Sequence, residues 1–438
     1  MTQRKNIDIK NVRSVAFEAL KKCESCGQYS NIALDNALKK SELSRSDKGL
    51  ATTLFYGVIE KRITLDYFIS ALSSRNINDI DKDTLILLRM GIYQLCFLDR
   101  VPDHAAINET VSLAPAKTRG FINAVLRAYT REAAKIKLPA RDEGEVYSLS
   151  VRFSVGEKIL EKLISVYGYE RCEKMLSAID GDSTTTLRTN TLKIGRDELV
   201  AKLGGEITEL SPYGIKRSGQ VSELYGFEDG LFYVQDEASQ LCAMALGAKR
   251  GETVIDTCSC PGSKSFGIAI DMENEGELYS FDLHKNKLSL VESSAKRLGI
   301  TIIRTEERDG RKPNEALLGK AHRVLCDVPC SGFGVMGKKP ELRYKNPEES
   351  AALPGIQYDI LKNSAKYLSA GGTLVYSTCT ILPEENEKNV ERFLCEHPDF
   401  ALEPFVAGKL EVPSGMVTLL PDEYGTDGFF IAKLIKKK

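Results

Sequence analysis

The chain has 438 residues, which is long enough for two or three domains that each bury a core of their own. It carries 60 Lys and Arg against 61 Asp and Glu, and 42% of its residues are hydrophobic, so its composition is that of a globular protein rather than a disordered or membrane-embedded one. No apolar run reaches the roughly 20 residues of a membrane helix, and the start "MTQRKNIDIK" lacks the layout of a signal peptide, so we expect no membrane association and a cytoplasmic location.

Charge is distributed unevenly along the chain. Residues 1–140 hold 22 Lys and Arg against 15 Asp and Glu, whereas the remaining residues hold 38 against 46. An excess of basic residues in one part of a nearly neutral protein predicts a polyanionic partner. A solvated helix surface would give the same count, so charge alone leaves both interpretations open.

The eleven cysteines are odd in number and scattered from Cys23 to Cys395, which fits a reducing compartment better than a disulfide framework. Cys23 and Cys26 form a CxxC sequence. No second cysteine or histidine pair follows at zinc spacing, and the four histidines are far apart, so we expect no metal site.

The first 140 residues have helical periodicity throughout. In "DTLILLRMGIYQLCFLDR" the apolar positions recur at steps of three and four residues: Leu85, Leu88, Ile92 and Leu95. Pro102 closes this segment, and "NVRSVAFEAL", "TLDYFISAL" and "GFINAVLRAYTRE" repeat the period. Residues 1–140 are therefore predicted to form an all-α bundle.

Residues 141–245 are predicted to form a connector and a small α+β segment. "LPARDEGEVYSLS", which begins at Leu138, is polar and contains Pro and Gly, as a connector would. Beyond it lie a helical "RDELVAKLGGE" and a strand-like "GLFYVQDEA".

After Gly251 short apolar strands alternate with helices. The expected strands are "TVID", "ELYSFD", "TIIR", "HRVLCD" and "TLVYST", with helices such as "NKLSLVESSAKRLG" and "IQYDILKNSAKYLSAGG" between them and a closing strand "GFFIAKLIK". Residues 246–438 are therefore predicted to form an α/β, doubly wound, Rossmann-like domain with a mostly parallel sheet.

The first of these strands runs into a Pro-Gly turn that opens a helix, "DTCSCPGSKSFGIAI". Ligands of such folds bind at the carboxyl ends of the strands, where Gly262 allows a close backbone approach and Asp282 could hold both hydroxyls of a ribose. The chain has neither GxGxxG nor GxxxxGK[ST] at this turn, so a cofactor with a ribose and no phosphate remains, and S-adenosylmethionine is such a cofactor. Asp282 could instead cap a helix.

Cys330 and Cys379 each follow a predicted strand. The residues between them hold a helix and a strand, enough for a βαβ unit, so both thiols would face one pocket if the two strands are neighbours. A thiolate that adds to C6 of a pyrimidine makes C5 able to accept a methyl group, a second thiol could assist release, and Asp327 could hydrogen-bond the base edge. Both cysteines could equally be small core residues, as we expect Cys326 to be.

Several segments resemble known motifs. "DTCSCPGSK", "DVPCSGFGV", "RYKNPEE" and "YSTCTILPEENE" resemble, in order and spacing, the motifs of the RNA cytosine-5 methyltransferases. "LFYGVIEKRITLDYFI", "LLRMGIYQL" and "VPDHAAINETVSLA" resemble the NusB-like RNA-binding domain. Their fusion is similar to the bacterial Sun or RsmB family, which methylates a cytosine of 16S ribosomal RNA.

The resemblance implies roles for individual residues. Cys379 would be the nucleophile, Cys330 would assist product release, and Asp327 would act with them at the methyl-transfer end of the cofactor. Asp282 would contact the ribose of S-adenosylmethionine and Asp309 would lie near its adenine. The turn that contacts the cofactor would be Cys258, Ser259, Cys260, Pro261, Gly262, Ser263 and Lys264. The residues that would meet RNA phosphates are Lys338, Lys339, Arg343 and Lys345, although a solvated loop would also explain them.

The chain departs from the family pattern in two places. The family's turn usually reads Cys-Ala-Ala-Pro-Gly-Gly-Lys, whereas Ser259, Cys260 and Ser263 stand here in place of the alanines and the second glycine. A Cβ at 263 would tighten the turn if that backbone needs a positive φ, which would weaken or adjust cofactor binding. Met336-Gly337-Lys338 stands where the family often has an arginine, which leaves the RNA contact there open.

We therefore expect methylation of C5 of a cytosine in 16S ribosomal RNA, with S-adenosylmethionine as cofactor and the target base out of its stack. Two alternatives remain. The substrate could be transfer RNA or another RNA, or the chain could be a non-catalytic RNA-binding factor of ribosome assembly. Protein partners stay open, and the sequence is compatible with a monomer.

Overall fold

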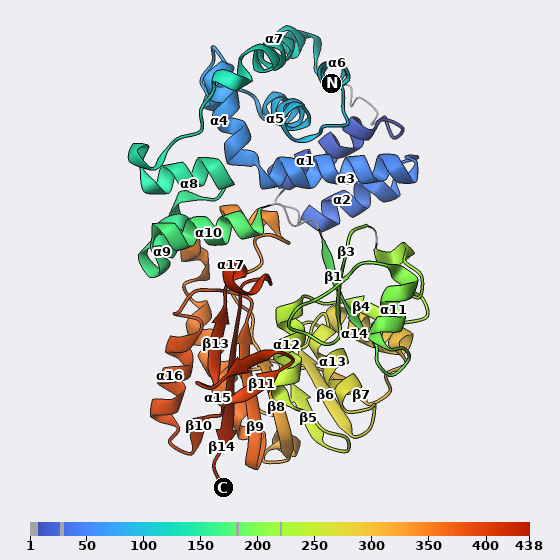
Figure 1. The fold of residues 1–438 in the computed structure, drawn as a ribbon, viewed down its shortest axis with the longest axis vertical. Coiled ribbons are helices and arrows are strands. Elements are labelled where there is room, and N and C mark those ends of the chain that lie inside the picture. The colour runs from blue at the N-terminus through green and yellow to red at the C-terminus, as the bar shows by residue number, and fades with distance from the viewer. Residues whose placement is uncertain (1–7, 27–29, 181–183, 220) are drawn as a thin grey trace. The chain divides into compact units, whose positions relative to one another are not determined.

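The computed structural model describes residues 8–26, 30–180, 184–219 and 221–438, and it divides into two compact units (Figure 1). Unit 1 comprises Met1–Glu173 and Lys338–Asn346, and unit 2 comprises Lys174–Gly337 and Pro347–Lys438. The segment Lys338–Asn346 therefore belongs structurally to unit 1, although it lies in the sequence between two segments of unit 2.

The regular elements of unit 1 that the structure describes are all helices. The α-helices are α1 (Val12–Cys26), α2 (Ser30–Lys39), α3 (Arg45–Glu60), α4 (Arg62–Leu72), α5 (Lys82–Phe97), α6 (Asp103–Leu113), α7 (Ala116–Glu132), α8 (Glu145–Phe153) and α9 (Glu157–Tyr167), and the boundary with unit 2 falls in α10 (Tyr169–Ile179). Short 3₁₀ turns are η1 (Ile77–Asp79), η2 (Ala133–Lys135), η3 (Arg141–Glu143) and η6 (Pro340–Tyr344).

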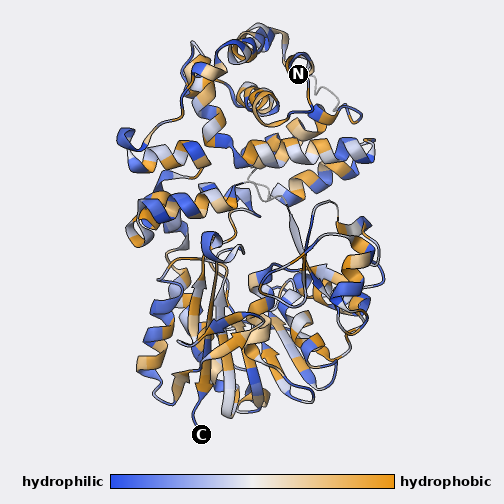
Figure 2. Cartoon of the chain, in the orientation of Figure 1, coloured by the Kyte–Doolittle hydropathy of each residue, from blue (hydrophilic) through white to orange (hydrophobic). Residues whose placement is uncertain are grey.

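The core of unit 1 confirms the predicted helical periodicity. Leu88 and Ile92 on α5 are fully buried, and Leu85 and Leu95 pack against the same cluster. Figure 2 shows hydrophobic and hydrophilic residues on the same helices, as amphipathic helices around one core require.

The predicted connector at residues 138–150 is partly wrong, because α8 begins at Glu145. Leu149 and Phe153, four residues apart, share one buried face of this helix, and Ser148, Ser150 and Val151 are buried as well, so no amphipathic pattern revealed the helix in the sequence. The helix ends at Ser154, which has a left-handed backbone with φ of 57°.

Unit 2 contains the expected small α+β segment. Its strands are β1 (Thr185–Thr189), β2 (Glu206–Ile207), β3 (Gly214–Arg217) and β4 (Phe232–Val234), with α11 (Arg196–Leu203) and η4 (Val221–Glu223) between them. They form an antiparallel sheet in the order β2-β3-β1-β4, over a core that includes Leu187, Leu199 and Phe232.

The larger sheet of unit 2 is the predicted doubly wound one. Its strands are β5 (Thr253–Asp256), β6 (Glu277–Asp282), β7 (Ile303–Glu307), β8 (Ala321–Asp327), β9 (Leu368–Thr378), β10 (Phe400–Leu402), β13 (Met416–Leu419) and β14 (Phe429–Lys436), and β11 (Phe405–Ala407) pairs separately with β12 (Leu410–Val412). The order is β10-β14-β9-β8-β5-β6-β7, with β13 beside β14. Strands β5 to β9 run parallel and the closing β14 runs antiparallel to β9.

Helices cover both faces of this sheet. The helices are α12 (Glu237–Leu246), α13 (Ser263–Asp271), α14 (Lys285–Leu298), α15 (Leu353–Lys366), α16 (Glu387–Glu396) and the short α17 (Pro421–Tyr424), with η5 (Glu315–Leu317) and η7 (Pro347–Ser350) in the loops. Alternate strand residues point to opposite faces, so Leu325 joins the core under α12, α13 and α14, whereas Cys326 joins the core under α15 and α16. Cys326 is therefore the core residue that the sequence predicts.

The helix expected over residues 356–372 is shorter than predicted. α15 ends at Lys366, and Leu368 already pairs with Ala321 in the sheet. The segment "LSAGG" consequently starts strand β9, and Gly371 there has a φ of 75°, which favours glycine.

Candidate active site

The carboxyl ends of the parallel strands bring the predicted site residues to one edge of the sheet. Asp256, Asp282 and Asp327 end β5, β6 and β8, and Cys379 follows β9. The chain winds from β5 toward β6 and β7 in one direction and from β8 toward β9 in the other, so a crevice is expected outside β5 and β8.

The turn after β5 is held in a tight conformation. The Ser259 amide donates to the Phe281 carbonyl at 2.7 Å, and the Gly262 amide donates to the Ser259 carbonyl at 2.6 Å. Gly262 has a φ of 105°, and a Cβ there would lie 2.6 Å from the ring of Phe266, so this position requires glycine. α13 begins directly after it.

The strain considered for Ser263 is absent. Ser263 is the first residue of α13, and the non-glycine residues with positive φ in the described ranges are Ser154, Glu273 and Asn274. The serine therefore needs no left-handed backbone, and the predicted tightening of the turn does not arise.

Asp282 makes a contact at the start of α14, the alternative that the sequence left open beside a ribose contact, which stays a prediction. Its Oδ1 accepts a hydrogen bond from the backbone amide of His284, the N-cap residue of α14, at 2.9 Å. The Cys260 thiol also faces this carboxylate, and burial together with Asp282 raises the pKa of Cys260 to about 12. Asp282 thus caps the loop while it remains half-buried at the end of β6, where a ribose is expected.

Asp309, expected near adenine, already has a basic partner. Its carboxylate accepts from the Arg311 side chain at 2.9 and 2.8 Å and from the Arg311 backbone amide at 3.0 Å. The bond to the Arg311 side chain holds the pKa of Asp309 below its usual value.

A buried ion pair, between Lys264 and Asp327, lies at the end of β8. The Lys264 ammonium donates to Asp327 Oδ2 at 2.7 Å, and the Ser377 hydroxyl donates to Asp327 Oδ1 at 2.8 Å. Burial alone would lower the pKa of Lys264, but the Asp327 carboxylate outweighs it, and Cys379 adds to the same effect, so the pKa of Lys264 is raised. Lys264 is therefore a permanent cation that acts on Asp327 and on Cys379.

The two thiols are adjacent, as the sequence predicts. Cys330 Sγ lies 3.1 Å from Cys379 Sγ, neither cysteine is in a disulfide, and their strands pair directly, with Asp327 opposite Ser377. The hydrogen bond to Cys379 and burial both raise the pKa of Cys330 well above the usual value for a thiol. Cys330 therefore keeps its proton near neutral pH, and the neighbouring sulfur of Cys379 interacts with the Lys264 cation.

Contacts that the sequence did not predict fix the loops on which the two cysteines lie. The Glu385 carboxylate accepts from the Ser331 amide at 2.9 Å and from Gln357 Nε2 at 2.7 Å. The hydroxyls of Ser331 and Thr380, each one residue after a cysteine, lie 2.8 Å apart. Glu385 lies inside the quoted segment "YSTCTILPEENE", but only its burial in the structure distinguishes it from the other acidic residues there.

Asp256 is a further buried carboxylate that the sequence placed only as a strand end. It is 1% exposed and accepts from the Ser265 hydroxyl at 2.6 Å and from the Cys258 amide at 3.3 Å. Burial raises the pKa of Asp256 to about 7. The group lies at the end of β5, directly before the turn.

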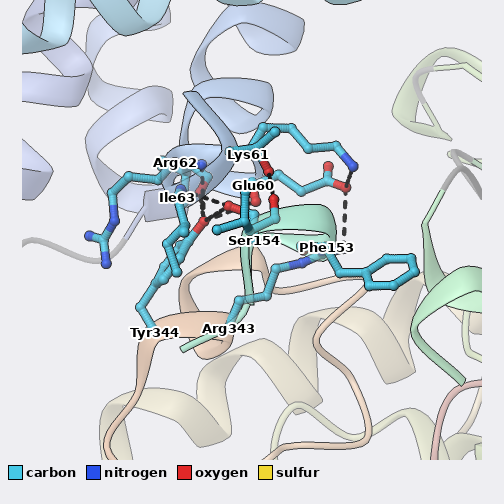
Figure 3. Close-up of polar contacts among 11 residues, drawn as sticks. Glu60, Lys61, Arg62, Ile63, Phe153, Ser154, Arg343 and Tyr344 are labelled. Carbon is cyan, nitrogen blue, oxygen red and sulfur yellow. Dashed lines mark hydrogen bonds and ion pairs between the residues drawn. The ribbon is translucent and has the colours of Figure 1, made fainter. Parts of the chain in front are cut away.

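The predicted RNA contact of Arg343 is wrong. Arg343 is 2% exposed and lies inside unit 1 (Figure 3), where it donates to the Phe153 carbonyl at 2.7 Å and to Glu60 Oε1 at 3.2 Å. Lys338 and Lys339 are exposed and Lys345 is half-buried. The charge of Arg343 therefore serves the packing of the helical unit, and the lysines beside it keep their predicted role as a hypothesis.

The described residues contain no group of three or more His, Cys, Asp and Glu side chains placed to hold a metal ion. Cys23 is half-buried, whereas the side chain of Cys26 lies outside the described residues. None of the helices within the described ranges combines the length and apolar character that a bilayer crossing requires.

Comparisons with known proteins match both parts of the chain. The model of the family "16S rRNA methyltransferase RsmB/F" matches residues 243–435, and that of the NusB family matches residues 10–131. A probable ribosomal RNA small subunit methyltransferase B of Bacillus subtilis (strain 168) is 39% identical over 98% of this chain and 99% of its own length. The ribosomal RNA small subunit methyltransferase B of Escherichia coli O127:H6 is 32% identical over 98% of this chain and 99% of its own length.

Solved structures are similar in fold. The crystal structure of a protein named PH0851 has a TM-score of 0.79 and 28% identity, and the match covers 99% of each chain. That of NSun6 from Pyrococcus horikoshii with SFG has a TM-score of 0.58 and 25% identity, and covers 65% of this chain and 98% of that one. These matches confirm the family and the fold class expected from the sequence. The chain belongs to the ribosomal RNA small subunit methyltransferase B family, in which a NusB domain and a methyltransferase domain of the RsmB/F type occur in one protein.

Proposed function

We propose that this methyltransferase transfers a methyl group from S-adenosylmethionine to C5 of a cytosine in 16S ribosomal RNA, through a covalent bond between Cys379 and C6 of the base. The observation that carries the proposal is the contact of two thiols, 3.1 Å apart at the ends of adjacent parallel strands, beside a buried cation. A methyltransferase that acts on oxygen or on an exocyclic nitrogen has no need of such a pair, because those atoms are already nucleophilic.

The turn after β5 fits a nucleoside cofactor. Gly262 allows the left-handed turn to pack against the Phe266 ring, the start of α13 presents backbone amides, and Asp282 is half-buried at the end of β6. We assign S-adenosylmethionine contacts to the turn from Cys258 to Lys264, to Asp282 and to Asp309, and Asp309 would have to share its carboxylate with Arg311. When bound, this cofactor supplies an electrophilic methyl group. The homologous NSun6 structure contains SFG, an analogue of that cofactor.

Cys379 performs the addition in this mechanism. Its thiolate, stabilised by the Lys264 ammonium, attacks C6, and the electron pair moves toward C5. Carbon C5 thereby becomes a nucleophile like the carbon of an enamine and accepts the methyl group. The cytosine must first leave its stack to come within reach of a sulfur on the sheet edge.

Cys330 performs the release. Its proton is held chiefly by the hydrogen bond to Cys379, and that bond weakens once Cys379 has become a thioether. The pKa of Cys330 then falls, so the thiol can lose its proton to solvent and take up the proton of C5 as a general base. The C6–S bond breaks, the aromatic ring is restored and Cys379 leaves as the thiolate.

Asp327 orients the base. Each of its oxygens accepts one hydrogen bond, from Lys264 or from Ser377, and a carboxylate oxygen can accept a second one. The cytosine amino group or a protonated N3 is a suitable donor. The ion pair fixes the carboxylate at the end of β8, three residues before Cys330, so the base edge and C6 would be placed together.

Relatives over the full length support ribosomal RNA as the substrate, since they are named as ribosomal RNA small subunit methyltransferases. We keep the three-part division into a NusB-like domain at 1–140, a connecting α+β segment at 141–245 and a catalytic domain at 246–438 as a proposal. The family models at residues 10–131 and 243–435 support its outer parts. Lys338 and Lys339 are exposed candidates for phosphate contacts.

Incubation with transcribed 16S RNA and methyl-labelled S-adenosylmethionine tests the proposal. Label should appear in 5-methylcytosine, Cys379→Ala should abolish transfer, and Cys330→Ala should accumulate a covalent protein–RNA adduct. Cys395→Ala is the matched control, because Cys395 is a free and exposed thiol on α16. Unchanged transfer by Cys379→Ala would refute the covalent mechanism.

The same assay distinguishes the rival functions. Label in transfer RNA alone would move the substrate assignment to that RNA. A calorimetric titration that gives no binding heat with S-adenosylmethionine, together with RNA binding by the full chain, would instead indicate a non-catalytic assembly factor.

A further inference from the structure

Glu385 is a buried acid with an unusual position between the two cysteine loops. Glu385 is 2% exposed and lies in the loop between β9 and α16. One oxygen, Oε2, accepts both the Ser331 amide at 2.9 Å and Gln357 Nε2 at 2.7 Å. Ser331 directly follows Cys330, so this carboxylate is attached to the backbone next to one of the two thiols.

The same residue is tied to the strand that carries the other thiol. The Tyr376 hydroxyl donates to the Glu385 carbonyl at 2.6 Å, and Tyr376 lies on β9 three residues before Cys379. Gln357 on α15 extends the connection, since its Nε2 also donates to the Pro329 carbonyl at 3.0 Å. Glu385 and Gln357 thus hold both sides of the loop that contains Cys330.

We propose that Glu385 is a positioning residue of the thiol pair: its buried carboxylate holds the Cys330 loop beside Cys379 and keeps the proton of the pair on Cys330. This inference rests on the proposed function and assigns a residue that contributes to the choice of which cysteine attacks and which one serves release.

The electrostatics of the pair agree with this role. Four titratable groups face Cys330: Cys379 after β9, Glu385 on the loop, Asp327 at the end of β8 and Tyr376 on β9. The bond to Cys379 is the largest contribution to the raised pKa of Cys330, with burial next and Glu385 among the further causes. On the other side, the Lys264 cation acts on Cys379. A carboxylate near one sulfur and an ammonium near the other place the proton on the first and the charge on the second.

The negative charge of Glu385 remains after the addition step, so Glu385 also has a function during release. When Cys379 has become a thioether, the contribution of its charge to Cys330 is lost, whereas the Glu385 carboxylate stays. Cys330 then remains a stronger base than an isolated thiolate would be, because the neighbouring negative charge favours uptake of a proton. The proton that it takes is the one on C5.

Glu385→Gln separates charge from position. A glutamine oxygen in place of Oε2 can still accept from both Ser331 and Gln357, so the loop keeps its two hydrogen bonds and loses only the charge. The measurement is the pH dependence of Cys330 alkylation by iodoacetamide, resolved by peptide mass spectrometry in a Cys379→Ser background. The midpoint should fall by roughly one pH unit, which means about tenfold faster alkylation at a fixed pH below it.

A matched control and a second variant complete the experiment. Glu391→Gln removes the same charge from an exposed position on α16 and should leave the midpoint unchanged. Gln357→Met keeps the Glu385 carboxylate but removes the donor to both the Pro329 carbonyl and Glu385 Oε2, so it loosens the Cys330 loop and should accumulate the protein–RNA adduct.

An unchanged midpoint in Glu385→Gln would overturn the inference. Alkylation of wild-type Cys330 at a lower pH midpoint than Cys379 would overturn it as well, whether or not the variants fold. Both alkylation midpoints are measured without RNA or cofactor, so they are independent of methyl transfer. A failed transfer assay with a shifted midpoint would contradict the proposed function alone.

Discussion

Two buried cations, one in each unit, show how differently the same kind of side chain is used. In unit 2 the Lys264 ammonium pairs with Asp327 at the edge of the sheet, where the acid is 25% exposed and faces the crevice. In unit 1 the Arg343 guanidinium is 2% exposed and binds Glu60 and the Phe153 carbonyl (Figure 3). The first pair borders reactive sulfur atoms, whereas the second is enclosed by helices.

The partners explain the difference. Around Lys264 the neighbours are ionisable groups, Asp327, Cys379 and Cys242, whose charges can change during a reaction. Around Arg343 they are helix ends: the guanidinium binds the last residue of α8, and the following Tyr344 binds the end of α3 and the start of α4. A cation among titratable groups tunes chemistry, while a cation among backbone carbonyls fixes helices. The predictions below test that distinction.

The largest expected effect concerns Asp256, the buried carboxylate at the end of β5 in unit 2. Its folded pKa of about 7 lies above the ordinary 3.8, because burial penalises the charged form. Between these values the folded chain holds a proton that the unfolded chain has lost, so the free energy of unfolding falls as the pH rises, by up to about 4 kcal/mol at pH 7. Above pH 7 this dependence ends.

Asp256→Asn should remove this fall in the free energy of unfolding with rising pH. The amide cannot ionise, and its oxygen can still accept from Cys258 or Ser265. Urea unfolding of unit 2 at pH 4 to 8, followed by amide exchange, measures the effect. Asp197→Asn is the control, because that side chain is 90% exposed. A wild-type profile that is flat over this range would contradict the prediction.

The second effect is on catalysis. Lys264→Met removes the cation from the thiol pair and leaves Asp327 without its ammonium, so Cys379 should be less ionised at pH 7. Single-turnover methyl transfer should fall at least a hundredfold, equivalent to about 2.7 kcal/mol in the barrier. Lys296→Met, on the exposed side of α14, should have no such effect. Full activity in Lys264→Met would mean that Lys264 is structural, like Arg343.

The sequence predicted the edge of the sheet better than it predicted what surrounds it. Parallel strands must end at one edge, so Asp282, Asp327 and Cys379 could be placed together from their positions after strand patterns. The 3.1 Å contact of the thiols follows from the same geometry. No comparable rule reveals Glu385, since an acidic residue in a polar segment is ordinarily solvated, and only packing against Ser331 and Gln357 buries it.

Arg343 is the converse case, in which the local sequence predicted an exposed functional residue and the structure shows a buried one. In the sequence it stands among lysines close to Cys330, as a phosphate contact would. Its acidic partner Glu60 is 283 residues away, and no local pattern connects the two. Periodicity also missed α8, whose buried face is interrupted by serines. Errors of this kind arise wherever the deciding contact is distant in the chain.

Arg343→Ala should destabilise unit 1 without affecting the cofactor site. The change leaves the Phe153 carbonyl without its donor and the partly exposed Glu60 with only the longer ion pair to Lys61 at 3.8 Å, which should cost about 2 kcal/mol. Limited proteolysis and urea unfolding should show the loss, whereas calorimetric affinity for S-adenosylmethionine should not change. Lys339→Ala, at an exposed neighbour, is the control. Weaker RNA binding with unchanged stability would restore the predicted phosphate contact.

The smallest expected effect concerns one hydroxyl, that of Tyr344, which directly follows Arg343. The Tyr344 hydroxyl accepts from the Arg62 amide at 3.1 Å and lies within donating distance of the Ile59 carbonyl at 2.7 Å, so it bridges the end of α3 and the start of α4. Tyr344→Phe removes both contacts but keeps the ring, which stacks on the Arg62 guanidinium at 3.7 Å. The loss should be about 1 kcal/mol.

Hydrogen exchange can read this effect at single amides. The Arg62 amide loses its acceptor in Tyr344→Phe, so it should exchange about fivefold faster, the factor that corresponds to 1 kcal/mol. The Leu65 amide of the same helix donates to the Lys61 carbonyl at 2.9 Å and keeps its partner, so it serves as a control in the same molecule. Equal acceleration of both amides would mean that the ring, or the whole helix start, has moved. A change confined to Arg62 would show that the unit 1 cluster acts through defined hydrogen bonds at helix ends, in contrast to the titratable neighbours of Lys264.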